Sequence, residues 1–196
     1  MSTFEKNLMI DIPLLNNIGL ATEMTNAELE CYFDILHEYN EHIIDADQSL
    51  ARIISDLALC MELSIKFRLL QEHWAFIFDD LIKAKEEALE TGDFISVSFR
   101  HGIIRLRNIC GISTSFDKCF ELYKLRNKVQ HFTLTQEPLT NVLTILSQSI
   151  NEICDFLSTH VLPYVEDEDV VKDFEKELQR LNSNGVQLEK ARKRFS

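Results

Sequence analysis

Apolar residues recur three and four positions apart along most of the chain, the spacing of an amphipathic α-helix. The strongest pattern covers residues 47–72, where further apolar side chains widen the stripe until it surrounds the helix. A helix that is apolar on all sides lies at the centre of a bundle or in an interface between subunits. Weaker stripes predict four more helices and a last amphipathic one: 26–46, 94–110, 114–133, 138–163 and the stretch that follows Pro163.

Breaks in this pattern divide the chain into three parts. Residues 1–24 are apolar but contain Pro13 and Gly19, so we expect a short helix or an extended arm there. Thr25 or Asn26 would cap the next helix. The sequence therefore predicts an arm over 1–24, a helical bundle over 25–165, and a C-terminal amphipathic helix with a frayed basic tail over 166–196.

Few residues favour turns. The chain of 196 residues has only five Gly and three Pro, and sheets consume many more of both. Gly92 and Gly111 each end a helical stretch, Ser113 or Ser115 can cap the following helix, and Pro138 stands where a helix starts and where its missing N–H does no harm. The expected fold class is all-α, a bundle of about five or six main helices.

Composition narrows the classes of function. The net charge of −12 argues against a broadly basic nucleic-acid-binding surface, although a small basic site remains compatible with it. No apolar run reaches 18 residues, so we expect no membrane span, and the N-terminus lacks the features of a secretory signal. Five cysteines without a CxxC pair are typical of a reduced protein, so the expected location is cytoplasmic.

The sequence LRNKVQHF, residues 125–132, places polar side chains on an otherwise apolar helix. On a helical wheel, Asn127 extends an arc of Phe116, Cys119, Phe120 and Tyr123, and Arg126 and His131 flank it. Asn127 and His131 are one turn apart and can touch. A second arc, nearly opposite the first, consists of Leu122, Leu125, Val129 and Phe132. The wheel therefore predicts two apolar faces, one of which becomes polar.

Two interpretations of this polar stretch stay open on the residues alone. A partly buried arginine needs a partner, which for Arg126 is either a carboxylate such as Glu62 or Glu121, or a phosphate. Histidine is the side chain best suited to proton transfer near neutral pH. The string therefore marks either a structural hydrogen-bonding cluster or a site of phosphate chemistry.

The order Arg126-Asn127-Lys128-Val129-Gln130-His131 resembles the R-x(4–6)-H motif of HEPN domains in its RNxxxH form. Residues 55–78 also resemble an early helix of bacterial HEPN proteins, and the likeness spans roughly 45–165. This resemblance implies an all-helical bundle that forms a homodimer, with the motif helix at the interface. Where some HEPN toxins carry a tyrosine two positions after the histidine, this chain has Thr133.

The resemblance implies a metal-independent endoribonuclease without a cofactor, of the toxin–antitoxin or anti-phage type. Arg126, Asn127 and His131 would be catalytic, and an antitoxin or defence-system protein would be a further partner. Lys124, Lys128 and Gln130 would help to bind the RNA. The alternative is a non-catalytic HEPN-like module that dimerises or binds a partner or nucleotide. A third, a metal-binding bundle, has little support because HExxH and ExxH are absent from the sequence.

Overall fold

The described residues form an all-α protein, as the pattern predicts. The computed structural model describes the backbone of residues 3–37, 43–131 and 137–195, and the side chains of 12–36, 48–129 and 137–195. No helix within these ranges is both long and apolar enough to cross a membrane. The α-helices are α1 (Thr3–His37), α2 (Ile43–Glu72), α3 (Glu86–Thr91), α4 (Phe99–Ile109), α5 (Asp117–His131), α6 (Leu139–His160) and α7 (Glu168–Arg194).

The chain forms two compact units. Unit 1 contains residues 1–18 and 62–114, and unit 2 contains 19–61 and 115–196. The long helices α1 and α2 each contribute one part to either unit. Each unit combines two segments that are separate in the sequence, whereas the predicted arm, bundle and tail are three consecutive segments.

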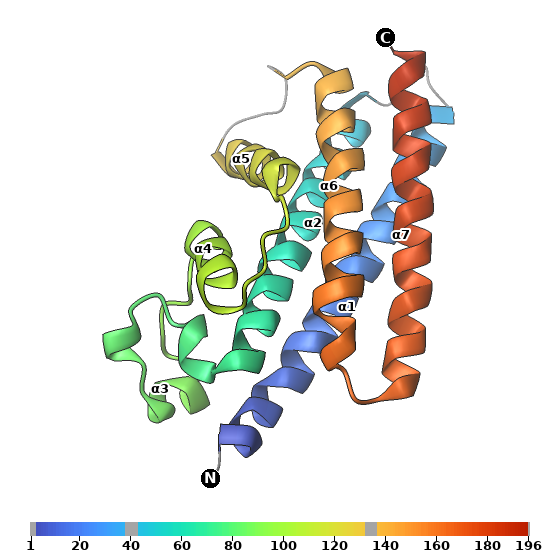
Figure 1. Cartoon of the computed structure of the whole chain (residues 1–196). Coiled ribbons are helices and arrows are strands. Elements are labelled where there is room, and N and C mark those ends of the chain that lie inside the picture. Colours follow the sequence, from blue (N-terminus) through green and yellow to red (C-terminus); the bar gives the residue numbers. More distant parts are fainter. Residues whose placement is uncertain (1–2, 38–42, 132–136, 196) are drawn as a thin grey trace. The chain divides into compact units, whose positions relative to one another are not determined.

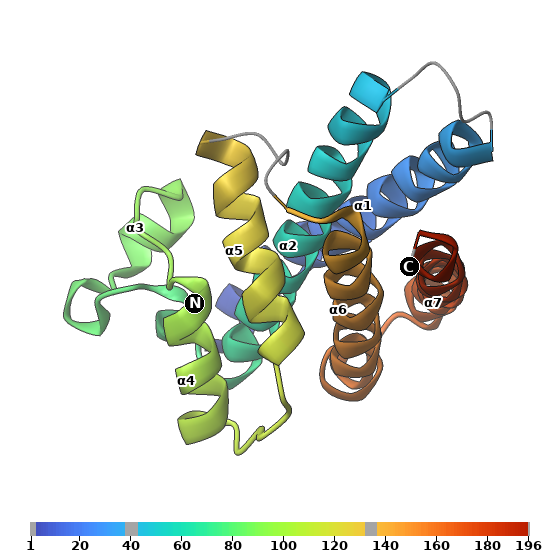
Figure 2. The same cartoon turned by 90° about the horizontal axis from the view of Figure 1, so that it is seen from above.

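Unit 2 is built on the pair α6 and α7. These helices are joined by the short 3₁₀ turn Leu162–Tyr164 and lie side by side in both views (Figures 1 and 2). The helix α5 packs on α6 as well. Gly185 of α7 brings the helices close together, since a Cβ placed there would lie 3.0 Å from Ile150 of α6. The largest fully buried side chains of this unit include Tyr32, Ile53, Ile54, Leu57 and Phe156.

The C-terminal helix is longer and better packed than the sequence predicts. It continues to Arg194, and Leu188 and Ala191 near its end are buried. The prediction of a frayed tail is therefore wrong for the residues up to 194. The basic residues of its last turn suit a helix C-terminus, where the backbone dipole is negative.

The helix α1 also corrects a prediction. The predicted short helix or arm over 1–24 is helical from Thr3, but it is the first part of one long helix that runs unbroken to His37, through Pro13 and Gly19. Gly19 packs beside the ring of Phe174 on α7, where an added Cβ would lie at an ordinary contact distance of 3.5 Å. Residues 38–42, which belong to the predicted helix 26–46, lie outside the described ranges, and α2 begins at Ile43.

Thr25 and Asn26 lie inside α1 rather than capping a helix. Thr25 donates its hydroxyl hydrogen to the carbonyl of Ala21, at 2.8 Å. Asn26 accepts from the amide of the buried Asn184 on α7 at 3.0 Å, and donates to the carboxylate of Glu177 at 2.9 Å. Buried amides that pair in this way fix the register of two helices, since sliding either one would leave polar groups unpaired. Asn26 therefore joins α1 to α7 through a hydrogen bond with a residue 158 positions away.

Unit 1 holds α4 against the second part of α2. A Cβ on Gly102 of α4 would lie 2.7 Å from the side chain of Ile65, so only glycine allows this approach. The helix begins at Phe99, not at residue 94 as predicted, because the preceding residues are extended. Val97 donates its N–H to the carbonyl of Ile77 at 2.7 Å, beside an antiparallel bridge between Phe78 and Ser96.

Candidate functional site

The helix that carries the motif, α5, is positioned by a carboxylate from α6. Glu152 accepts hydrogen bonds from the backbone N–H groups of Lys118 at 3.1 Å and Cys119 at 2.9 Å. Ser115 accepts from the N–H of Asp117 at 3.4 Å, but it lies one residue before the cap position, which Phe116 occupies. The first turn of a helix has unpaired N–H groups and a positive dipole, so an anion there is stabilising. Glu152 therefore anchors the start of the motif helix.

We expect the substitution Glu152→Ala to destabilise the protein by about 1–2 kcal/mol, because two backbone N–H groups lose a charged acceptor. Denaturant unfolding measures this free energy. The matched control is Asp155→Asn on the same helix, whose side chain is exposed and should change stability by less than about 0.5 kcal/mol. Equal effects of the two substitutions would show that Glu152 does not anchor α5.

One continuous strip of α5 is buried, rather than two opposite faces. Its members are Phe116, Cys119, Leu122 and Leu125, which come from both arcs of the predicted wheel. The ring of Phe116 meets that of Phe156 on α6 edge to face, with centroids 5.4 Å apart. Phe120, Tyr123 and Val129 are half-buried at the borders of the strip. The neighbouring helices therefore cover one side of α5, and the opposite side carries exposed polar residues.

Arg126 lies at the border between the buried strip and solvent. It is half-buried, and its guanidinium carbon lies 5.8 Å from the centroid of the Tyr123 ring, in cation–π range. Of the two carboxylates that the sequence offers as partners, Glu62 accepts from Lys66 at 2.7 Å and Glu121 from Lys118 at 3.0 Å. Arg126 has a further interaction besides its contact with Tyr123.

The remaining predicted site residues differ in their surroundings. Asn127 and Lys124 are exposed. Lys128 forms an ion pair with Glu137, and the Lys128 ammonium holds the pKa of that carboxyl below its usual value. Glu137 also accepts from the amide of Asn141 at 3.2 Å. Lys128 therefore reaches an anionic ligand only in competition with Glu137.

His131 is the last residue of α5, and Gln130 precedes it. The side chains of these two residues lie outside the described ranges. The helix backbone nevertheless places position 131 one turn after Asn127, on a helix whose start is fixed by Glu152. The described part of the motif consists of the Arg126 guanidinium, which lies over the Tyr123 ring, and the exposed amide of Asn127. Such groups suit a phosphate, because arginine binds its oxygens through two parallel N–H donors.

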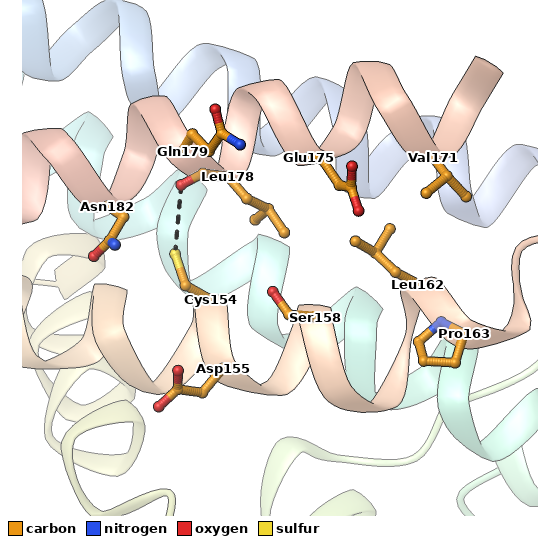
Figure 3. A pocket seen from close by; sticks show the side chains of 10 residues that line it. All are labelled: Cys154, Asp155, Ser158, Leu162, Pro163, Val171, Glu175, Leu178, Gln179 and Asn182. Carbon is orange, nitrogen blue, oxygen red and sulfur yellow. Dashed lines mark hydrogen bonds between the residues drawn. The ribbon is translucent and has the colours of Figure 1, made fainter. Parts of the chain in front are cut away.

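A second candidate site is a groove between α6 and α7, with a volume of about 600 Å³. Figure 3 shows that its lining comes from both helices and the turn between them. Two carboxylates, Asp155 and Glu175, stand among apolar and amide side chains. The other lining residues are Cys154, Ser158, Leu162, Pro163, Val171, Leu178, Gln179 and Asn182.

The thiol of Cys154 in this groove is a poor nucleophile. The Sγ of Cys154 points to the carbonyl oxygen of Leu178 at 3.9 Å (Figure 3), and burial raises the pKa of the thiol to about 12. The thiolate is the reactive form of cysteine, so this residue stays unreactive at neutral pH. Burial likewise raises the pKa of the Cys119 thiol. The groove therefore offers shape and charge, but no activated thiol.

We expect an alkylating reagent at pH 8 to modify Cys31, which is exposed, long before Cys154. With a pKa of about 12, only about one Cys154 side chain in ten thousand is a thiolate at that pH, and this fraction rises about tenfold per pH unit. Peptide mass spectrometry after timed labelling measures both rates, with urea-unfolded protein as the control in which they converge. Equal rates in the folded protein would contradict the burial of this thiol.

Among the residues that the structure describes, no three histidine, cysteine, aspartate or glutamate side chains are grouped to hold a metal ion. The sequence-based hypothesis missed two carboxylates that contact α5. Glu152 accepts from backbone N–H groups at its start, and Glu137 forms an ion pair with Lys128. Glu152 lies 33 residues from the N–H of Cys119. No local signal identifies it, since it forms part of an ordinary amphipathic helix.

No protein-family model, curated protein or solved structure matches this chain.

Proposed function

We propose that the protein is a metal-independent endoribonuclease of HEPN type that cuts RNA at a site shared by two protomers, in toxin–antitoxin or anti-phage defence. The observation that carries the proposal is the placement of Arg126, which α5 holds at the edge of solvent and braces against Tyr123. The resemblance of the motif to HEPN domains supplies the type of reaction. The cytoplasmic location and an antitoxin-like or defence-system partner belong to the same proposal.

The proposed reaction is attack by a ribose 2′-oxygen on the adjacent phosphorus. The imidazole of His131 takes the proton of the 2′-hydroxyl, and an imidazolium gives a proton to the 5′-oxygen that leaves. A bond from the 2′-oxygen to phosphorus forms as the bond to the 5′-oxygen breaks, which yields a 2′,3′-cyclic phosphate and a 5′-hydroxyl. Arg126 stabilises the negative charge that builds on the phosphoryl oxygens. Asn127 orients either His131 or a phosphate oxygen.

A dimer completes this site. One arginine and one histidine five residues apart supply a single cation and a single proton carrier, whereas the two proton transfers above need a base and an acid. A second copy of α5 across a two-fold axis supplies the missing imidazole. Lys124 is exposed and available to the RNA backbone, and Lys128 contributes where phosphate displaces Glu137.

The proposal is tested by incubating the purified protein with several RNAs in excess EDTA, beside Arg126→Ala and His131→Ala. Cleavage by the wild type that both substitutions abolish, with folding preserved by circular dichroism, is the expected result. A folded wild type that cuts none of the RNAs would instead favour the second function, a non-catalytic module that binds a partner or nucleotide. The observation that favours this second function is the ion pair of Lys128 with Glu137, because Lys128 is then not free to bind RNA.

A further inference from the structure

Positive charge in unit 1 is concentrated on α4. The run 94–116, which contains this helix, has three arginines and no aspartate or glutamate, in a chain whose net charge is −12. The negative charge is concentrated elsewhere: unit 2 has 22 acidic and 12 basic residues, whereas unit 1 has 10 and 8. A polyanion that approaches this protein is therefore repelled least by unit 1, and α4 is its most basic helix.

One of the three arginines is structural. Arg105 donates to the backbone carbonyl oxygens of Phe76 at 2.8 Å and Asp79 at 2.7 Å, and also to that of Phe78. Together with the close contact at Gly102, these bonds fix α4 on the rest of unit 1. The helix is consequently a rigid support for the residues on its outer side.

The outer side of α4 presents the other two arginines to solvent. Arg100 and Arg107 are exposed, and neither forms an ion pair with any residue that the structure describes. They are seven residues apart, which is about 10 Å along a helix and close to the rise of three stacked nucleotides at about 3.4 Å each. Ile104 lies between them and is 47% exposed, and Asn108 is exposed one turn further. An acidic residue does contact this helix: His101 lies 3.5 Å from the carboxylate of Asp79.

We propose that this face of α4 binds the phosphate backbone of single-stranded RNA, outside the motif of α5. Each guanidinium can form two parallel hydrogen bonds with a phosphate, and the apolar side chain between them can pack on a ribose or a base. An acidic protein partner fits less well, because a docked helix needs several apolar anchors and Ile104 is the one exposed apolar side chain among the described residues between the arginines. That RNA is the natural ligand rests on the proposed function, whereas the binding itself is independent of cleavage.

The test uses a fluorescent 20-nucleotide 2′-O-methyl RNA of mixed sequence, which attack by a 2′-hydroxyl cannot cut. Fluorescence anisotropy gives its affinity between 0.05 and about 0.3 M KCl for the wild type and for the double variant Arg100→Gln/Arg107→Gln. The matched control is Lys83→Gln/Lys85→Gln, which removes the same charge from two exposed lysines of the same unit. A polyglutamate peptide of equal length serves as a competitor, and circular dichroism checks that each variant folds.

Loss of two single-strand phosphate contacts should lower the slope of log affinity against log salt by about 1.4, and weaken binding about 25-fold at 0.1 M salt. The lysine control should bind much as the wild type does. The assignment is overturned by a wild type that does not bind, by equal losses in both double variants, or by polyglutamate that competes as well as RNA. Because the probe is uncleavable, binding without any ribonuclease activity would leave this surface standing and overturn only the proposed reaction.

Discussion

Replacing Arg126 by lysine is expected to slow RNA cleavage by at least about 100-fold, although the positive charge is retained. The guanidinium lies over the ring of Tyr123 and offers donors in a planar fork that matches two phosphoryl oxygens. A lysine ammonium is a point charge that keeps neither the stacking nor the paired geometry. The measurement is the single-turnover rate constant on a defined RNA at saturating protein.

The control for this substitution is Lys124→Arg, made on the exposed side of the same helix. A lysine that contacts phosphate only as a charge should tolerate arginine, so its rate should stay within about threefold of the wild type. If Arg126→Lys cleaves as fast as the wild type, Arg126 does not bind the transition state through its fork. Its position beside Tyr123 would then be structural.

One inactive protomer is expected to silence an active partner. The proposed reaction needs one imidazole as base and a second as acid, so a dimer of one wild-type and one His131→Ala protomer keeps a single proton carrier. Its cleavage rate should fall by at least about 100-fold, whereas two independent sites would leave about half of the wild-type rate. The experiment is single-turnover cleavage by heterodimers isolated through two different tags.

The control is a dimer of two wild-type protomers isolated through the same two tags, which should cleave at the full rate. Mixed heterodimers that keep about half of this rate would show that each protomer contains a complete site of its own.

Helical periodicity predicted the fold class, since every long stripe of apolar residues in the described part of the chain is a helix. It failed at helix ends where distant contacts decide. Asn26 has the properties of a cap, yet it lies inside α1 because Asn184 and Glu177 of α7 satisfy its amide. Pro13 and Gly19 are poor helix formers, yet α1 runs through both, and Gly19 lies beside the ring of Phe174 on α7.

The candidate site could be predicted only in part. The motif is local in sequence, and its position on a helix follows from the spacing of the apolar residues around it. Its electrostatics are not local. Glu152 anchors α5 from the next helix, and Glu137 binds Lys128. Such contacts depend on how helices pack, which neither periodicity nor a short motif records.

The most direct test of the proposed ribonuclease reaction compares one RNA with a version that carries 2′-deoxyribose at the nucleotide before the cleaved bond, both in excess EDTA. If the 2′-oxygen attacks, the wild type cuts the RNA to a 2′,3′-cyclic phosphate and a 5′-hydroxyl, and leaves the substituted strand intact at that bond. Equal cleavage of both strands, or none by a folded wild type, would contradict this reaction.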